Sequence, residues 1–153
     1  MRPRTSPRRV PQQFPTLQQE ESLALQGFRR IAGLDEAGRG SWAGPLVAAA
    51  VCLPAPDPDL LTLLDGVRDS KLLTAAKRAR LYERILQHSV DVGVGVVSAA
   101  TIDRVGLTMA GELAMLWAVE DMAHPPDSLL IDAFALRGSG LPELADTNAR
   151  SGE

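Results

Sequence analysis

Two apolar runs joined by a short glycine-rich link limit most strongly how this chain can fold. The second run, Pro45 to Leu53 (PLVAAAVCL), is continuously apolar, β-branched at two positions and followed by a proline, which is typical of a buried strand. The first run, Arg30 to Glu36, also reads as a strand and ends in two carboxylates. Because the link from Ala37 to Gly44 is short, the sequence predicts that the two strands form a hairpin.

The remaining elements follow in the order helix, strand, helix, strand. Apolar periodicity and a possible Thr74 cap indicate the first helix, and Thr108 is the expected cap of the second. Before the first helix come a proline-rich loop from Pro54 to Asp59 and a brief apolar stretch from Leu60 to Leu64. This order predicts a mixed α/β layer fold. The predicted ranges are Thr74–His88, Val90–Ser98, Thr108–Met122 and Ser128–Asp132. A short helix that begins at Ser98 or Thr101 is expected after the second of these ranges.

Side-chain spacing predicts which faces of these elements are buried. Gly93 and Gly95 fall on one face of the third strand, which indicates that another element lies close to it there. In each helix, a set of residues at helical spacing is expected to face the core. These residues are Ala79, Tyr82, Ile85 and Leu86 in the first helix and Leu113, Leu116 and Trp117 in the second.

The 153 residues are enough for one domain with one core. Residues 1–26 are rich in Pro, Arg and Gln and are expected to be a disordered extension, with a helical turn near Leu17–Leu25. The folded domain is expected over 27–144, and 145–153 form a polar tail. The first 30 residues hold six arginines against two glutamates, which suits either a nucleic-acid-binding arm or a solvated extension.

Cysteine content and hydropathy suggest the compartment. The single cysteine, Cys52, excludes an internal disulfide, which fits a reducing compartment, and we expect a cytoplasmic protein. No apolar stretch approaches the roughly 20 residues of a membrane helix, and no apolar segment follows the charged N-terminus as in a secretory signal.

Three carboxylates lie at or near predicted strand ends: Asp35, Glu36 and Asp132. Because strand side chains alternate between faces, Asp35 and Glu36 converge only if the strand ends or bulges between them. Carboxylates gathered without His or Cys would need a cation, and their hard oxygens favour Mg²⁺ or Mn²⁺ over zinc. Two such ions support phosphodiester cleavage. The alternative is that Asp35 and Glu36 are surface charges and Asp132 is a helix cap.

The tripeptide Gly38-Arg39-Gly40 directly follows the acidic pair. Its glycines expose backbone groups to a ligand, and its arginine offers a fork for phosphate. The tripeptide precedes a strand, not a helix, so it does not match a dinucleotide-binding loop, and the chain has no GxxxxGK phosphate loop. A small-molecule-binding domain is therefore the weaker interpretation.

Four ordered motifs over residues 28–142 resemble those of the ribonuclease HII family. They are GLDEAGRGSWAGPLVAAAVCLP (33–54), DSKLLTAAKRARLYERI (69–85), GVGVVSAATID (93–103) and LLID (129–132). The resemblance implies a ribonuclease-H-like mixed sheet flanked by helices. It also implies an endonuclease that uses Mn²⁺ or Mg²⁺ to cut the RNA strand of RNA–DNA hybrids and to nick at ribonucleotides embedded in DNA. Its product ends would be a 3′-hydroxyl and a 5′-phosphate.

The resemblance also implies roles for individual residues. Asp35, Glu36 and Asp132 match the metal-binding and catalytic carboxylates, and Gly38, Arg39 and Gly40 match the loop that senses the ribose 2′-hydroxyl. Ser70 and Lys71 match positions near the substrate backbone, although a turn that precedes a helix would look the same. Three basic residues of the first predicted helix recur at helical spacing: Lys77, Arg80 and Arg84. They form either a phosphate-binding strip or a solvated face.

The match to the family breaks after Leu144. The family continues with a Gly-Asp that supplies a fourth carboxylate, a helix of small residues and a tyrosine that stacks on the substrate. Asp146 is near the place of the fourth carboxylate but falls in the polar tail, and Tyr82 is expected in the core. We expect a chain truncated at the C-terminus that lacks the final strand and helices: a monomer if complete, prone to aggregation if truncated. The alternative function is an inactive product that only binds hybrid.

Overall fold

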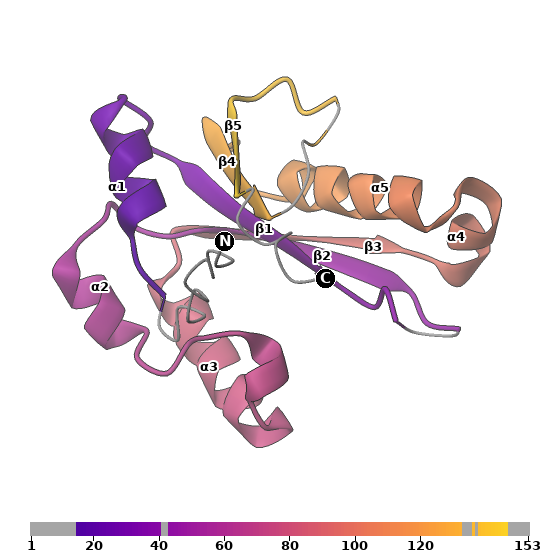
Figure 1. The fold of residues 1–153 in the computed structure, drawn as a ribbon, viewed down its shortest axis with the longest axis horizontal. Helices are drawn as coiled ribbons and strands as arrows, with labels where there is room; N and C mark the ends of the chain where they lie inside the picture. The colour runs from indigo at the N-terminus through magenta and orange to yellow at the C-terminus, as the bar shows by residue number, and fades with distance from the viewer. Residues whose placement is uncertain (1–14, 41–42, 133–135, 137, 147–153) are drawn as a thin grey trace, which may run out of the picture.

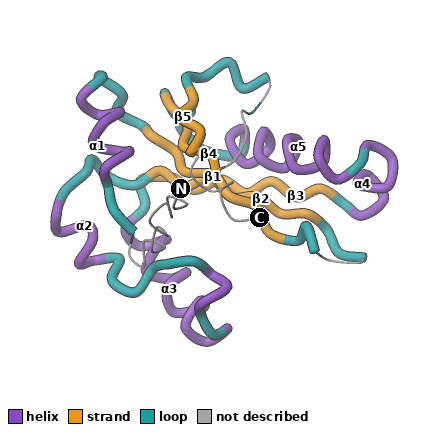
Figure 2. The backbone as a smooth tube through the Cα atoms, viewed as in Figure 1, coloured by secondary structure: helices purple, strands orange, loops and turns teal. Residues whose placement is uncertain are grey.

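The computed structural model describes residues 15–40, 43–132, 136 and 138–146, with the backbone alone at 132 and 144–146. A single sheet of five strands, in the order β3-β2-β1-β4-β5, lies at the centre of the described part. Figure 1 and Figure 2 show the helices arranged around it. The strands are β1 (Ile31–Ala37), β2 (Leu46–Cys52), β3 (Asp91–Val97), β4 (Ser128–Asp132) and β5 (Glu143–Asp146).

The sheet is mixed, as predicted. β1 and β2 form the expected antiparallel hairpin, and β3 pairs antiparallel with β2. β4 pairs parallel with β1, and β5 pairs parallel with β4. The prediction that the C-terminal strand is missing was wrong, because residues 143–146 form β5. This short segment, ELAD, has no β-branched residue and carries a carboxylate at each end, so its sequence alone did not indicate a strand.

Helix α1 precedes the first strand, and the other helices and one 3₁₀ turn lie in connections between strands. Thr74 caps α3 as predicted, since its hydroxyl accepts a hydrogen bond from the Lys77 N–H. A full helix, α1, forms where only a helical turn was expected, and it buries Leu23. The bounds are α1 (Gln18–Leu25), α2 (Pro58–Leu63), the turn η1 (Ser70–Leu72), α3 (Ala75–His88), α4 (Ala99–Val105) and α5 (Leu107–Glu120).

The glycines of β3 allow α5 to lie directly on the sheet. A methyl group on Gly95 would collide with the carbonyl oxygen of Ala114, and one on Gly93 with that of Ala118. The close approach predicted from these two glycines is therefore confirmed, and α5 runs along β3 in Figure 1. Small residues form the matching face of the helix. Its buried residues are Ala110, Gly111, Ala114, Met115 and Ala118.

Two expectations for α5 were wrong. Thr108 is not its cap, because the helix begins at Leu107 and the residue before it, Gly106, has a φ of 82° that separates α5 from α4. Trp117 is 40% exposed instead of facing the core. Leu113 and Leu116 are partly buried against the core, as predicted. The sheet contact selects small residues, so the largest side chain of the helix lies outside it.

The buried face of α3 also differs from the prediction. Tyr82 and Leu86 are 58% and 40% exposed and Ala79 is exposed, whereas Leu81 is buried. Ile85 is half-buried, as predicted. Leu81 lies beside Gly66 in the segment that follows α2. The helix therefore turns its Leu81 side towards this segment, and Tyr82 is not part of the core.

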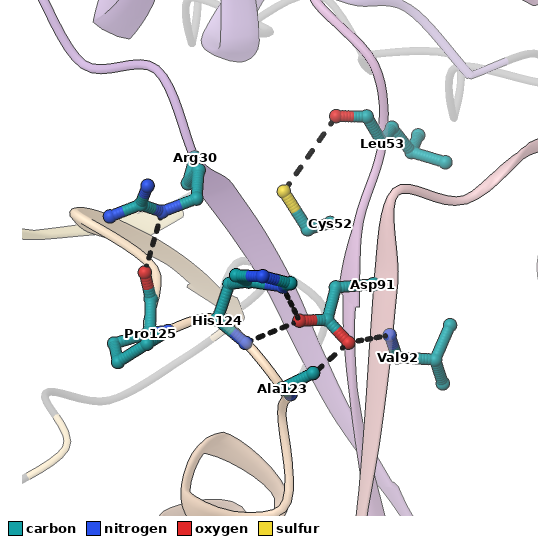
Figure 3. Close-up of polar contacts among 8 residues, drawn as sticks. All are labelled: Arg30, Cys52, Leu53, Asp91, Val92, Ala123, His124 and Pro125. Atoms are coloured by element: carbon teal, nitrogen blue, oxygen red, sulfur yellow. Dashed lines mark hydrogen bonds and ion pairs between the residues drawn. The ribbon is translucent and has the colours of Figure 1, made fainter.

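Asp91 joins the start of β3 to the turn that follows α5 (Figure 3). Its carboxylate accepts hydrogen bonds from the backbone N–H groups of His124 (2.8 Å), Ala123 (3.4 Å) and Val92 (2.9 Å). These bonds lower the pKa of Asp91 below its usual value, and the His124 bond has the largest effect. This single side chain fixes one end of α5 against the edge of the sheet.

Candidate functional site

The acidic pair lies within β1, not beyond its end. The pairing with β2 runs unbroken from Ala32 to Ala37, with Asp35 opposite Ala49 and Glu36 opposite Ala48. Strand β1 therefore neither ends nor bulges between the two acids, and their side chains leave it on opposite faces. The condition under which both would converge on one face is not met.

Asp35 lies on the sheet face opposite α5. It lines an open hollow of about 450 Å³ whose floor is made of small and apolar side chains. Its Oδ1 accepts a hydrogen bond of 2.8 Å from the Glu36 N–H, which holds the carboxylate close to the backbone. The other residues around the hollow are Gln19, Gly33, Leu34, Ala49, Val51, Leu130 and Ile131. An apolar wall beside a carboxylate strengthens its interaction with a cation.

Glu36 lies on the other face and contacts the glycine–arginine loop. Its side chain is only 14% exposed, and its Oε1 lies 3.0 Å from Nη1 of Arg39. The loop turns at Gly38, whose φ is 104°. A side chain at Gly38 would also bring a Cβ to 2.6 Å from the carbonyl oxygen of Pro45. The fold thus brings Glu36 and Arg39 together, at a bend that requires glycine.

Three aspartates occupy one row across neighbouring parallel strands. Leu34 of β1 is in register with Ile131 of β4, so Asp35 and Asp132 are the next positions along the two strands. Asp132 is in register with Asp146 of β5. Because neighbouring strands lie about 4.8 Å apart, these three backbone positions lie close together at one end of the sheet. The side chains of Asp132 and Asp146 lie outside the described residues.

Sequence reasoning underrated Asp146. It placed this residue in a polar tail because the surrounding sequence shows no strand pattern, whereas the structure places it in β5 beside Asp132. Across the residues whose side chains are described, no three His, Cys, Asp or Glu side chains are arranged to hold a metal. Predicting the aspartate row would have required knowing how strands far apart in the sequence pair.

Ser70 and Lys71 lie on the turn η1, and both are exposed. The Asp69 carboxylate caps this turn by accepting a 3.0 Å hydrogen bond from the Lys71 N–H. In the described part of the chain, neither the Ser70 nor the Lys71 side chain bonds to the carboxylates of β1. Ser70 and Lys71 therefore lie exposed on a turn whose shape Asp69 helps to fix.

The three basic residues of α3 do not share one environment. Arg84 donates a 3.1 Å hydrogen bond to the carbonyl oxygen of Asp65, and Lys77 is half-buried beside Gly66. Arg80 is exposed and forms no hydrogen bond or ion pair among the described residues. Of these three residues, only Arg80 is a solvated charge. Arg84 binds the segment that follows α2 through its hydrogen bond to Asp65.

Cys52 is not suited to nucleophilic chemistry. Its thiol is buried on β2, and burial raises its pKa, an effect that the nearby charges of Asp91 and Asp127 reinforce. A thiol with a raised pKa is a poor nucleophile. Cys52 is therefore not a candidate nucleophile. The candidate ligands of the site are oxygen atoms.

Comparison with known proteins identifies the family. The family model described as "Ribonuclease HII" matches residues 32–149, which include the acidic pair, the glycine–arginine loop and the aspartate row. The chain belongs to the ribonuclease HII family. A curated ribonuclease HII of Roseiflexus castenholzii is 51% identical over 129 residues, which cover 84% of this chain and 58% of that protein. The chain thus spans little more than half the length of that relative.

Solved structures agree with this assignment to ribonuclease HII. The ribonuclease H2 of Pyrococcus horikoshii OT3 superposes with a TM-score of 0.63 at 25% identity, over 76% of this chain and 61% of that one. The ribonuclease HIII called Bst-RNase HIII, solved in complex with Mn²⁺, superposes with a TM-score of 0.55 at 28% identity, over 72% of this chain and 39% of that one. The ribonuclease-H-like fold expected from the sequence is confirmed. Within the described residues, no helix is long and apolar enough to cross a membrane.

The oxygen donors of this ribonuclease HII chain suit a hard divalent cation. The aspartate row consists of carboxylates, whose oxygens are hard ligands. Such donors favour Mg²⁺ or Mn²⁺. Glu36 already has a cationic partner, in Arg39.

Proposed function

We propose that this chain carries the hydrolytic site of an endonuclease that cuts the RNA strand of RNA–DNA hybrids and nicks DNA at embedded ribonucleotides. The observation that carries the proposal is the row Asp35–Asp132–Asp146 at one end of the sheet, next to the glycine–arginine loop. Membership of the ribonuclease HII family supports the same activity.

Asp35, Glu36 and Asp132 are the proposed metal-binding and catalytic residues, with Mn²⁺ or Mg²⁺ as cofactor. Bound ions activate a water molecule and stabilise the leaving oxygen of a phosphodiester. Asp35 and Asp132 occupy neighbouring backbone positions in the row, and Asp146, the next position, is a candidate for a further carboxylate. Arg39 is paired with Oε1 of Glu36 and so competes with a cation for this carboxylate.

Gly38, Arg39 and Gly40 are the proposed sensors of the substrate ribose, and Ser70 and Lys71 the proposed contacts to its backbone. The 2′-hydroxyl distinguishes RNA from DNA, and a close backbone approach at a glycine allows it to be read. Lys71 is exposed and can pair with a phosphate. The proposed partner is therefore an RNA–DNA hybrid or DNA that contains ribonucleotides.

A second candidate function is binding of the hybrid without cleavage. The chain spans 58% of the Roseiflexus relative, so the activity of the whole relative is a proposal for this chain. The loop and the turn η1 would still contact nucleic acid. Cleavage and binding must therefore be measured separately.

The test uses a labelled DNA duplex that contains one ribonucleotide, incubated with Mn²⁺ or Mg²⁺. The full chain is compared with Asp132→Asn and with Asp103→Asn, a control that removes the same charge from an exposed position on α4. Asp146→Asn tests the added carboxylate. Hybrid affinity is measured in parallel by fluorescence anisotropy in Ca²⁺.

Nicking by the parent chain and by Asp103→Asn, with a loss of at least about 100-fold in Asp132→Asn, is the expected result. Binding without nicking would favour the second candidate function. If Asp132→Asn nicked as fast as the control, the proposed site would be wrong.

A further inference from the structure

We propose that Arg78 is a positioning residue that holds the turn η1 in the shape that presents Ser70 and Lys71 to the substrate. Arg78 lies on the first turns of α3, next to the basic residues that sequence reasoning selected, but was not itself selected. The inference rests on the proposed function, because Ser70 and Lys71 contact nucleic acid only if that function is right.

The Arg78 guanidinium reaches back across the N-terminus of its own helix. Its Nη1 donates a 2.7 Å hydrogen bond to the carbonyl oxygen of Leu73 and a longer one, of 3.4 Å, to that of Ser70. Leu73 is the residue after the C-terminal end of η1 and Ser70 is the first residue of the turn, so Arg78 ties the two ends of the turn together. Bonds from a charged donor are stronger than neutral ones.

The opposite end of the turn is held by Asp69. Its carboxylate accepts from the Lys71 N–H at 3.0 Å, and the backbone bonds of the turn run from Leu72 to Asp69 and from Leu73 to Ser70. The turn is therefore fixed by an anion at its start and a cation at its end. This arrangement leaves the Ser70 and Lys71 side chains exposed.

Neighbouring arginines lack this role. Arg80 is exposed and has no hydrogen-bond partner in the described ranges, and Arg84 donates to Asp65 in a different segment. Arg78→Ala and Arg80→Ala thus remove the same charge from the same helix, and only the first removes the contact with η1. Arg80→Ala is the matched control.

The first measurement is amide hydrogen exchange on the full chain, and it does not depend on any nucleic acid. Arg78→Ala is expected to speed exchange at Leu72 and Leu73 by about tenfold, because the turn loses its charged donor. Arg80→Ala should leave both amides unchanged. Unchanged exchange in Arg78→Ala would overturn the proposal, whatever the chain binds.

The second measurement is a double-mutant cycle with Lys71→Ala, read as affinity for an RNA–DNA hybrid in Ca²⁺. If Arg78 acts through the turn, Arg78→Ala weakens binding by about three- to tenfold in the parent chain and by much less in Lys71→Ala. Additive losses would mean that Arg78 contacts phosphate itself, and the positioning role would be wrong.

The two measurements separate failure of the inference from failure of the proposed function. If the parent chain bound no hybrid, or Lys71→Ala bound as well as the parent, Ser70 and Lys71 would have no substrate role and the purpose assigned to Arg78 would be refuted with it. If hybrid binding depended on Lys71 but not on Arg78, the proposed function would stand and the inference alone would fail.

Discussion

Arg39 and Glu36 form an ion pair, with Nη1 of Arg39 3.0 Å from Oε1 of Glu36. The arginine belongs to the proposed ribose-sensing loop, and the glutamate belongs to the proposed metal-binding set. The Arg39 guanidinium therefore neutralises a carboxylate that a metal ion could otherwise bind. The two halves of the proposed site are linked through this contact.

The ion pair predicts that Arg39→Ala binds Mn²⁺ more tightly than the parent chain. The variant removes both the competitor for Glu36 and a positive charge near the aspartate row. Since Arg39 is 45% exposed, the pair is worth less than about 1 kcal/mol, so the gain in affinity should not exceed about fivefold. Calorimetric titration with Mn²⁺ measures it, with Arg80→Ala as the equal-charge control. Equal affinity in Arg39→Ala and the parent would contradict the prediction.

The bend at Gly38 predicts a contrast between two neighbouring glycines. Gly38→Ala places a side chain at a φ of 104° and 2.6 Å from the Pro45 carbonyl oxygen, so it should destabilise the fold by about 1–3 kcal/mol and weaken hybrid binding. Gly40→Ala meets no atom of the described residues within 4 Å and should change stability by less than about 0.5 kcal/mol. Urea denaturation and hybrid affinity report the two effects. Similar losses of stability in both variants would show that the bend does not depend on Gly38.

The contact between α5 and β3 predicts a larger stability effect. Gly95→Ala forces a methyl group into the Ala114 carbonyl, and the helix must move from the sheet, at a cost of about 3 kcal/mol or more. Gly33→Ala is the matched control on β1, because its methyl group would lie 4.0 Å from the nearest atom, the Val51 carbonyl oxygen. Thermal unfolding of the two variants should differ clearly. A Gly95→Ala variant as stable as Gly33→Ala would rule out the close approach.

Local sequence signals were enough for the features that depend on neighbouring residues. The hairpin of β1 and β2 follows from two apolar runs and a short link, and the Thr74 cap from one hydroxyl before a periodic helix. The glycines of β3 also indicated a close neighbour, and α5 is that neighbour. These features need no knowledge of distant segments.

Features that depend on a distant partner were missed. The exposure of Tyr82 and Trp117 is set by what each helix packs against, which residue spacing does not reveal. The strand β5 exists because β4 offers it an edge, not because its own residues favour strands. The aspartate row has the same origin: each acid is visible in the sequence, but the register that aligns Asp132 with Asp146 is not.

The hydrogen bonds to Asp91 predict a specific loss of stability in acid. Its pKa is below the ordinary value of 3.8, chiefly because the His124 N–H donates to the carboxylate, while partial burial acts in the opposite direction. Asp91 thus takes up a proton less readily in the folded chain than in the unfolded one. It stabilises the fold above about pH 4, and this contribution disappears as the pH falls below 3.8 through the lower folded pKa.

Asp91→Asn should remove this part of the acid dependence. The amide cannot accept all three backbone hydrogen bonds, so the variant should be less stable than the parent at pH 6 and converge with it as the pH falls below 3.8. Asp103→Asn alters an exposed carboxylate on α4 that has no partner among the described residues, and it should track the parent at every pH. The urea midpoint, followed by circular dichroism between pH 6 and the acid limit of folding, gives the comparison. A constant offset between Asp91→Asn and the parent across this range would mean that Asp91 anchors α5 without linking its stability to protonation.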